Sequence, residues 1–160
     1  MKTAPPPMAA LVLLAAFALA GCGGPAARWI DQATAAHAQA DALLRGGDAS
    51  RAARVLDDLV SRPVPAGVAA HDRRAVLQDA YARLAGLALE RREPAQALRY
   101  AEAGLALGAA RDVFTSALRT LRGRAHEASG QDAEAARDYE AAQIVAEALL
   151  QEALSDGGSR

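Results

Sequence analysis

Cysteine, lysine and aromatic residues are scarce in this 160-residue chain, and each shortage excludes a class of protein. The single cysteine, Cys22, leaves no disulfide framework and no cysteine-based metal site. Lys2 is the one lysine, and the formal net charge of -1 comes without the basic stripe that binds nucleic acid. Aromatic residues make up 4% of the chain, which argues against an aromatic platform for sugars. The most abundant residues are Ala, Leu and Arg, a composition typical of helices.

Recognisable catalytic and metal-binding motifs are also missing. His37, His71 and His126 fall in separate segments, and none has a second histidine at the spacing of a helical metal site. No glycine-rich loop has the pattern that cradles a phosphate. We therefore predict that the protein is not an enzyme and binds neither a metal ion nor a dissociable cofactor.

Apolar residues recur at helical spacing in segments separated by Gly or Pro turns, which predicts an all-α fold. The expected helices cover residues 26–45, 48–61, 68–91, 94 onward, 112–129 and 132–154. Asp48 is placed to cap the second helix, and Pro94 stands at the start of the fourth, where proline is tolerated. The inward-facing residues expected on the fifth helix are Val113, Phe114, Ala117, Leu118 and Leu121. The last helix either caps the core or docks a partner through its apolar end, and residues 155–160 are expected to be disordered.

The N-terminal segment has the pattern of a processed signal. Lys2 is followed by an apolar run over residues 8–20, too short to cross a hydrocarbon core that needs about 20 residues. The run ends in Leu19, Ala20, Gly21 and Cys22, which resembles the lipobox of bacterial lipoproteins. The resemblance implies that residues 1–21 are removed and that Cys22 carries a diacylglyceryl group and an N-acyl chain. The alternatives are an ordinary secretory signal cut nearby and an uncleaved anchor.

Residues 22–25 would then be a lipidated cysteine with a short tether, and residues 26–154 would form one helical domain. Trp29, near the start of that domain, either packs on the core or lies at the membrane interface.

Three windows of the chain share a turn followed by an alanine-rich helix, beginning near Gly47, Arg92 and Gly130. They resemble the segment that leads into the second helix of a tetratricopeptide repeat. The small residues at the matching positions are Ala40, Ala52, Ala85, Ala97, Gly123 and Ala135. The resemblance implies three antiparallel helix pairs stacked as a short α-solenoid, with linkers longer than is usual in that family.

In that family the first helices of the pairs line a groove that holds peptides or helices of other proteins. The groove positions carried over to this chain are His37, Asp41, Asp79, Ala82, Arg124 and Glu127. The resemblances together imply a lipid-anchored adaptor that binds other cell-envelope proteins at the periplasmic face of the outer membrane. Outer-membrane assembly components and secretins are examples of such partners, the latter if the chain acts as a pilotin. The alternatives are a lipoprotein that binds a periplasmic peptide or peptidoglycan fragment, and an enzyme with an unrecognised site.

Overall fold

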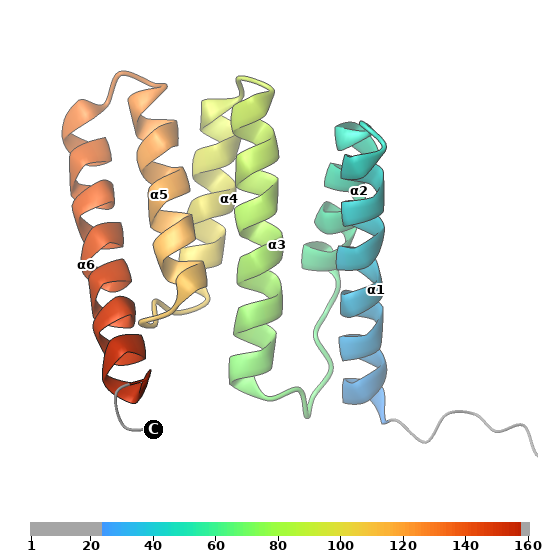
Figure 1. The fold of residues 1–160 in the computed structure, drawn as a ribbon. Coiled ribbons are helices and arrows are strands. Elements are labelled where there is room, and N and C mark those ends of the chain that lie inside the picture. The colour runs from blue at the N-terminus through green and yellow to red at the C-terminus, as the bar shows by residue number, and fades with distance from the viewer. Residues whose placement is uncertain (1–23, 158–160) are drawn as a thin grey trace, which may run out of the picture.

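A computed structural model describes residues 24–157, which form helices only (Figure 1). The described helices are α1 (Pro25–Arg45), α2 (Ala49–Ser61), α3 (Ala70–Glu90), α4 (Pro94–Ala106), α5 (Val113–Glu127) and α6 (Asp132–Gly157). The all-α prediction is confirmed. The signal-like segment, including Leu19, Ala20, Gly21 and Cys22, lies outside the described residues.

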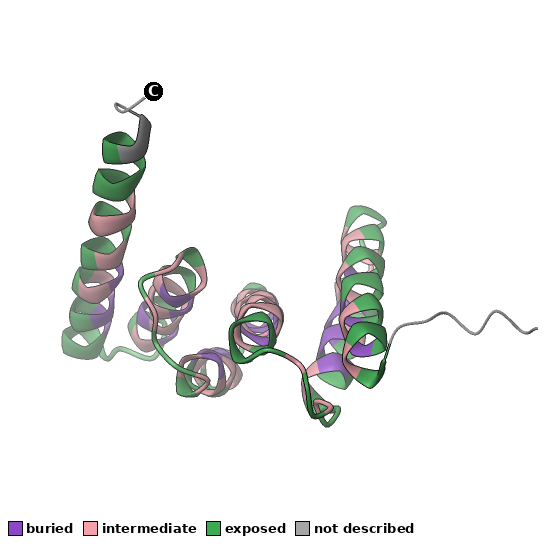
Figure 2. Cartoon of the chain, turned by 90° about the horizontal axis from the view of Figure 1, so that it is seen from below, coloured by how far each residue is buried: buried purple, intermediate pink, exposed green. Residues whose placement is uncertain are grey.

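The helices form three antiparallel pairs that lie side by side in chain order (Figure 1). Each helix contacts the next along the chain, and α3 also packs directly on α5. Seen along the helices, the row of pairs is curved, with α1 and α6 at its two ends (Figure 2). This arrangement is a small solenoid-like stack, as the fold-class prediction required.

Local sequence signals set most of the helix ends. The Asp48 carboxylate accepts a hydrogen bond from the Arg51 amide at 2.9 Å, which caps α2 as expected. Asp112 caps α5 in the same way, through the Thr115 amide at 2.8 Å. Gly47 follows α1 with a φ of 79°, a left-handed conformation that glycine adopts without strain.

Three predicted boundaries differ from the structure by two or more residues. Helix α5 ends at Glu127, two residues before the expected end at Ser129. Helix α3 begins at Ala70, two residues later than expected, because residues 66–69 continue the loop that the prolines begin. Helix α6 runs to Gly157, three residues beyond the expected end at Leu154. The disordered tail predicted from Ser155 is therefore wrong for residues 155–157, while residues 158–160 lie outside the described part.

Small side chains bring the helices together. Ala40, Ala52, Ala85 and Ala97 have 0% exposure, and the other two small positions named from the sequence, Gly123 and Ala135, are also buried. A Cβ added at Gly123 would stand 2.8 Å from the Tyr139 ring, so α6 lies against the bare backbone of α5. Tight contacts of this kind give dispersion energy without large side chains.

Replacing Ala97 by leucine should lower the free energy of unfolding by about 1 to 3 kcal/mol. Ala97 packs against Ala88 on α3 and Ala125 on α5, so three extra carbon atoms have no free volume there. Chemical denaturation of the variant measures the change. Ala95→Leu, at an exposed position of the same helix, is the matched control and should be close to neutral. Equal stability of the Ala97 variant and the wild type would show that α4 is not tightly packed against α3 and α5 at this position.

The expected inward face of α5 is partly wrong. Leu118 is fully buried and Phe114 and Leu121 are half-buried, but Val113 is 63% exposed and Ala117 is also exposed. The buried stripe of α5 is therefore narrower than the sequence pattern suggested. Val113 and Ala117 line a surface groove described below.

Candidate functional site

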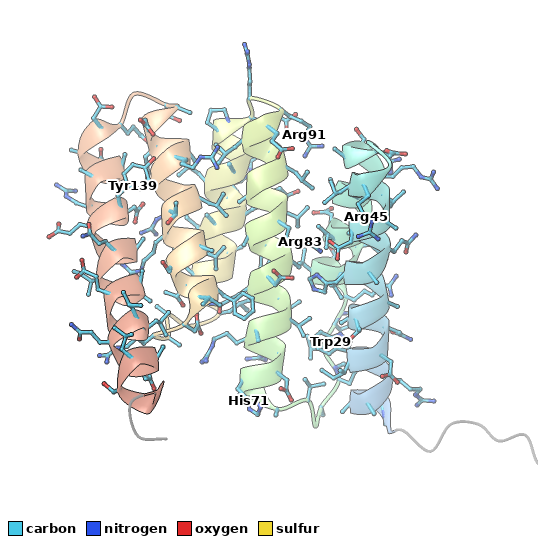
Figure 3. All side chains as sticks on the ribbon, in the orientation of Figure 1. Trp29, Arg45, His71, Arg83, Arg91 and Tyr139 are labelled. Carbon is cyan, nitrogen blue, oxygen red and sulfur yellow. The ribbon has the colours of Figure 1, made fainter. Side chains whose placement is uncertain are left out.

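Three of the predicted groove residues, His37, Asp41 and Asp79, come together with Arg83 in a polar cluster between α1 and α3. His37 Nδ1 lies 3.0 Å from Asp79 Oδ2, and Arg83 pairs with Asp41. Figure 3 shows Arg83 on the side of α3 that faces α1. Arg83 also lies 3.3 Å from His37 Nδ1. Both contacts use the same ring nitrogen, so at most one of them is a hydrogen bond in a given tautomer.

This cluster has a structural effect. Helices α1 and α3 share few backbone contacts, and the cluster links their side chains directly. Arg83 was missed in the sequence analysis because it lies between two groove positions, Asp79 and Ala82, and the helix pattern assigned it no role.

The remaining groove positions lie apart from this cluster. Ala82 is half-buried on α3, and Arg124 is exposed on α5. Glu127, at the end of α5, accepts a 2.7 Å hydrogen bond from the Tyr139 hydroxyl of α6. The structure therefore brings three of the six positions into an ionic link between α1 and α3, leaves two on α5, and places Ala82 on α3 outside both groups.

A charged contact joins α5 to α6. Asp138 is 5% exposed and accepts two hydrogen bonds from Arg122, at 2.8 Å from Nε and 2.5 Å from the terminal nitrogen. His126 Nε2 lies 3.7 Å from the same carboxylate. The hydrogen bond to Asp138 raises the pKa of Arg122, while burial acts in the opposite direction. The sequence pattern did not identify this pair, because its residues are 16 positions apart on different helices.

Tyr139 lies in the same interface, and Figure 3 labels it on α6. Burial, followed by the hydrogen bond to Glu127 and the charge of Glu127, raises its pKa to about 12 from the usual 10.0. The protonated phenol is therefore favoured in the folded state.

The free energy of unfolding should fall as the pH rises from about 10 to about 12, because the raised pKa means that the unfolded chain loses the Tyr139 proton first. Below that window the contribution is fully present. Tyr139→Phe should reduce the drop, which urea denaturation at about pH 9 and about pH 11 would measure. Tyr81 and Tyr100 also have raised pKa values, so the variant retains part of the dependence. If the free energy of unfolding of Tyr139→Phe falls with pH as much as that of the wild type, the pH dependence does not come from Tyr139.

Gln78 is a further polar group that the sequence did not reveal. Its side chain has 0% exposure, and its amide nitrogen donates to the carbonyls of Gly104 at 3.1 Å and Gly108 at 2.9 Å. These carbonyls belong to the last turn of α4 and the loop after it, and the Gly104 carbonyl also accepts from the Leu107 amide at 3.3 Å. Gln78 therefore caps α4 from α3 and fixes the start of the loop leading to α5.

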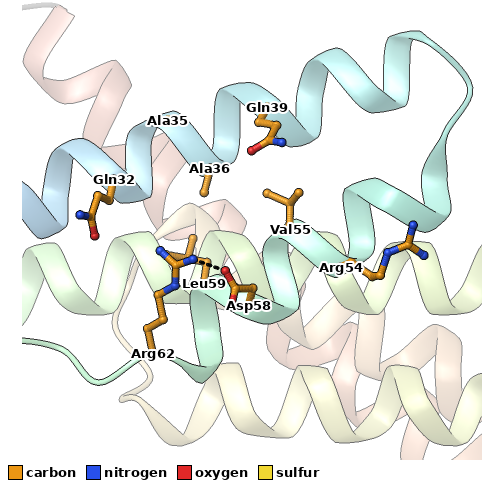
Figure 4. Close-up of a pocket in the computed structure, with 9 residues that line it drawn as sticks. All are labelled: Gln32, Ala35, Ala36, Gln39, Arg54, Val55, Asp58, Leu59 and Arg62. Atoms are coloured by element: carbon orange, nitrogen blue, oxygen red, sulfur yellow. Dashed lines mark hydrogen bonds and ion pairs between the residues drawn. The ribbon is translucent and has the colours of Figure 1, made fainter.

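The surface has two larger hollows, one at each end of the stack. A hollow of about 440 Å³ lies between α1 and α2, bordered by Gln32, Gln39 and the Asp58–Arg62 ion pair (Figure 4). The hollow between α5 and α6 is more apolar and has a volume of about 600 Å³. Both are open grooves between helices, a shape that accommodates a segment of polypeptide.

Within residues 24–157, no three His, Asp or Glu side chains gather as a metal ion would require. In the same part of the chain, no helix combines the length and apolar character needed to cross a bilayer. Trp29 is 4% exposed. Of the two positions considered for it, the core and the membrane interface, the structure places it in the core.

No protein-family model, curated protein or solved structure matches this chain. The fold and the surface define its class as a small all-α solenoid-like protein with open grooves at both ends.

Proposed function

We propose that this protein is a lipid-anchored, non-catalytic adaptor of the bacterial cell envelope that binds other envelope proteins. The observation that carries the proposal is the position of Cys22, three residues before α1 begins at Pro25. Acylation there would place the helical domain within about 10 Å of the lipid attachment, given about 3.5 Å per extended residue. The periplasmic face of the outer membrane is the proposed location, since Gly23 lacks the aspartate that marks inner-membrane retention in enteric bacteria.

The structure of residues 24–157 supports a binding role in two ways. Its helix pairs stack in a row, which exposes a large helical surface for its size. Its main hollows are grooves between neighbouring helices, lined partly by apolar side chains. Secretins and outer-membrane assembly components are the proposed partners.

Crosslinking in native membranes tests the adaptor role. The full-length protein is treated with a mild crosslinker and purified, and its partners are identified by mass spectrometry, with Cys22→Ser as the control. We expect one envelope assembly or secretion component that is enriched with the wild type and reduced with the control. Turnover or thermal stabilisation by a muropeptide, with no protein partner, would contradict the adaptor role and favour the ligand-binding alternative.

A further inference from the structure

A third hollow of about 310 Å³, called here the α1 pocket, opens where α1 begins. It is lined by Arg28, Trp29 and Gln32 of α1, by Arg62 directly after α2, and by Pro25, Pro63 and Pro65. A Cβ added at Gly67 would lie 3.9 Å from the Ala26 side chain, so the α2–α3 loop packs against the first turn of α1. The pocket is therefore built by packing between separate segments of the chain.

The lining of the α1 pocket carries positive charge and no carboxylate. Arg28 is exposed and forms no ion pair within residues 24–157. Arg62 pairs with Asp58 through Nη2, which leaves its Nε and Nη1 groups to donate elsewhere (Figure 4). Asp58 and the exposed Asp31 of α1 are not among the lining residues. This arrangement of charge suits an anion.

The backbone at the start of α1 acts in the same direction. Gly24 provides no side-chain cap, and the first turn contains no acidic residue. Pro25, the first residue of the helix, lines the pocket. The first N–H groups of a helix lack intrahelical acceptors and carry partial positive charge. An anion bound here would supply the acceptor that the sequence does not provide.

A hydrogen-bond donor of Trp29 is left without a partner. Trp29 is 4% exposed and lines the pocket, yet its buried indole Nε1 has no hydrogen-bond partner within residues 24–157. Figure 3 places Trp29 on the side of α1 that faces the α2–α3 loop. A buried N–H without an acceptor is costly, and the indole N–H usually finds one when buried. An oxygen atom bound in the α1 pocket would be that acceptor.

The position of the pocket in the chain indicates the source of such an anion. Pro25 follows Cys22 by three residues, so the pocket lies within about 10 Å of the proposed lipid attachment at about 3.5 Å per residue. Acyl chains on Cys22 would lie among phospholipids, whose headgroups border the hydrocarbon core. Headgroup phosphates are therefore the anions that the anchor would bring to this end of α1.

We propose that the α1 pocket binds the phosphate of a phospholipid headgroup. The guanidinium groups of Arg28 and Arg62 donate to the phosphate oxygens, and so does the indole N–H of Trp29. One such contact adds little to the affinity that the acyl chains provide, but it orients the helical domain on the membrane. The proposal names a lipid contact beside the proposed anchor and so rests on that function.

The fluorescence of Trp29 tests the proposal, because Trp29 is the one tryptophan in the chain and it lines the pocket. The protein is expressed as the full-length chain, purified from bacterial membranes in a neutral detergent, and titrated with dihexanoyl phosphatidylglycerol. Dihexanoylglycerol has the same acyl chains without the phosphate and is the first control. Inorganic phosphate is the second control, since it offers the charged group without a lipid.

We expect the phospholipid to change the Trp29 emission saturably, dihexanoylglycerol to leave it unchanged, and inorganic phosphate to bind much more weakly. The micelle concentrates the phospholipid beside the pocket, which it cannot do for inorganic phosphate. Arg28→Gln should weaken phospholipid binding by about tenfold, because it removes a charge-assisted hydrogen bond. Arg73→Gln is the matched control and should bind as the unchanged chain does, since Arg73 is exposed on α3 and does not line the pocket.

Three results would overturn the proposal. These are no saturable change with the phospholipid, an equal response to dihexanoylglycerol, and equal weakening by Arg28→Gln and Arg73→Gln. Inorganic phosphate that binds as tightly as the phospholipid would assign the pocket to a free anion instead.

The mass of Cys22 in the same preparation separates this test from the test of the anchor. Saturable binding by a chain with an unmodified Cys22 would support the pocket and contradict the anchor. An acylated chain that does not bind the phospholipid would overturn the pocket and leave the anchor in place.

Discussion

Replacing Arg122 by alanine should lower the free energy of unfolding by about 3 kcal/mol, the largest loss that we expect from a single polar side chain in this fold. Asp138 is 5% exposed and accepts both of its close hydrogen bonds from Arg122. Without Arg122, a nearly buried carboxylate would lose its main charge partner, and His126 at 3.7 Å is too distant to replace two short bonds. The expected loss is at the lower end of the range for buried pairs because the Arg122 side chain is 29% exposed.

Urea denaturation of matched variants measures this contribution. Arg124→Ala is the control, because Arg124 is exposed on the same helix two residues further on, and it should change stability by no more than about 0.5 kcal/mol. The double variant Arg122→Met with Asp138→Leu should recover much of the loss, since it removes both charges from the interface. Equal effects of Arg122→Ala and Arg124→Ala would show that the pair does not hold α5 and α6 together.

The second large effect concerns the membrane anchor. Replacing residues 1–21 by an ordinary secretory signal, together with Cys22→Ser, should move the protein from the membrane fraction to the soluble periplasmic fraction. Each buried methylene contributes roughly 0.8 kcal/mol to membrane binding, so the loss of two or three acyl chains removes nearly all affinity. Trp29 cannot compensate, because it is buried in the helical domain.

Fractionation of cells that express both forms measures the change. The matched control carries the same secretory signal with Cys22 retained, which separates the effect of the signal from that of the side chain. If the protein remains in the membrane fraction after Cys22→Ser with the ordinary signal, another surface holds it there and the lipid anchor is not what localises it.

The sequence predicted the helices well because their signals are local. The Asp48 cap and the glycine and proline turns act within a few residues, so they can be located without knowledge of the fold. The small positions Ala52 and Ala97 were also identified correctly as buried, since their spacing in the shared windows places them on one face.

The contacts between helices could not be predicted in the same way. The cap that Gln78 provides to α4 spans 26 to 30 residues, and the pairing of Arg83 with Asp41 spans 42 residues. Whether Val113 faces the core or solvent depends on how far α6 lies from α5, which hydrophobic periodicity alone does not specify.

The most direct test of the central claim is the intact mass of the protein extracted from the membranes of a diderm bacterium that expresses the full-length chain. The account predicts a chain that begins at Cys22 and carries the added mass of a diacylglyceryl group and an N-acyl chain on that residue. A chain that begins elsewhere, that retains residues 1–21, or that has an unmodified Cys22 would contradict the proposal of a lipid-anchored adaptor.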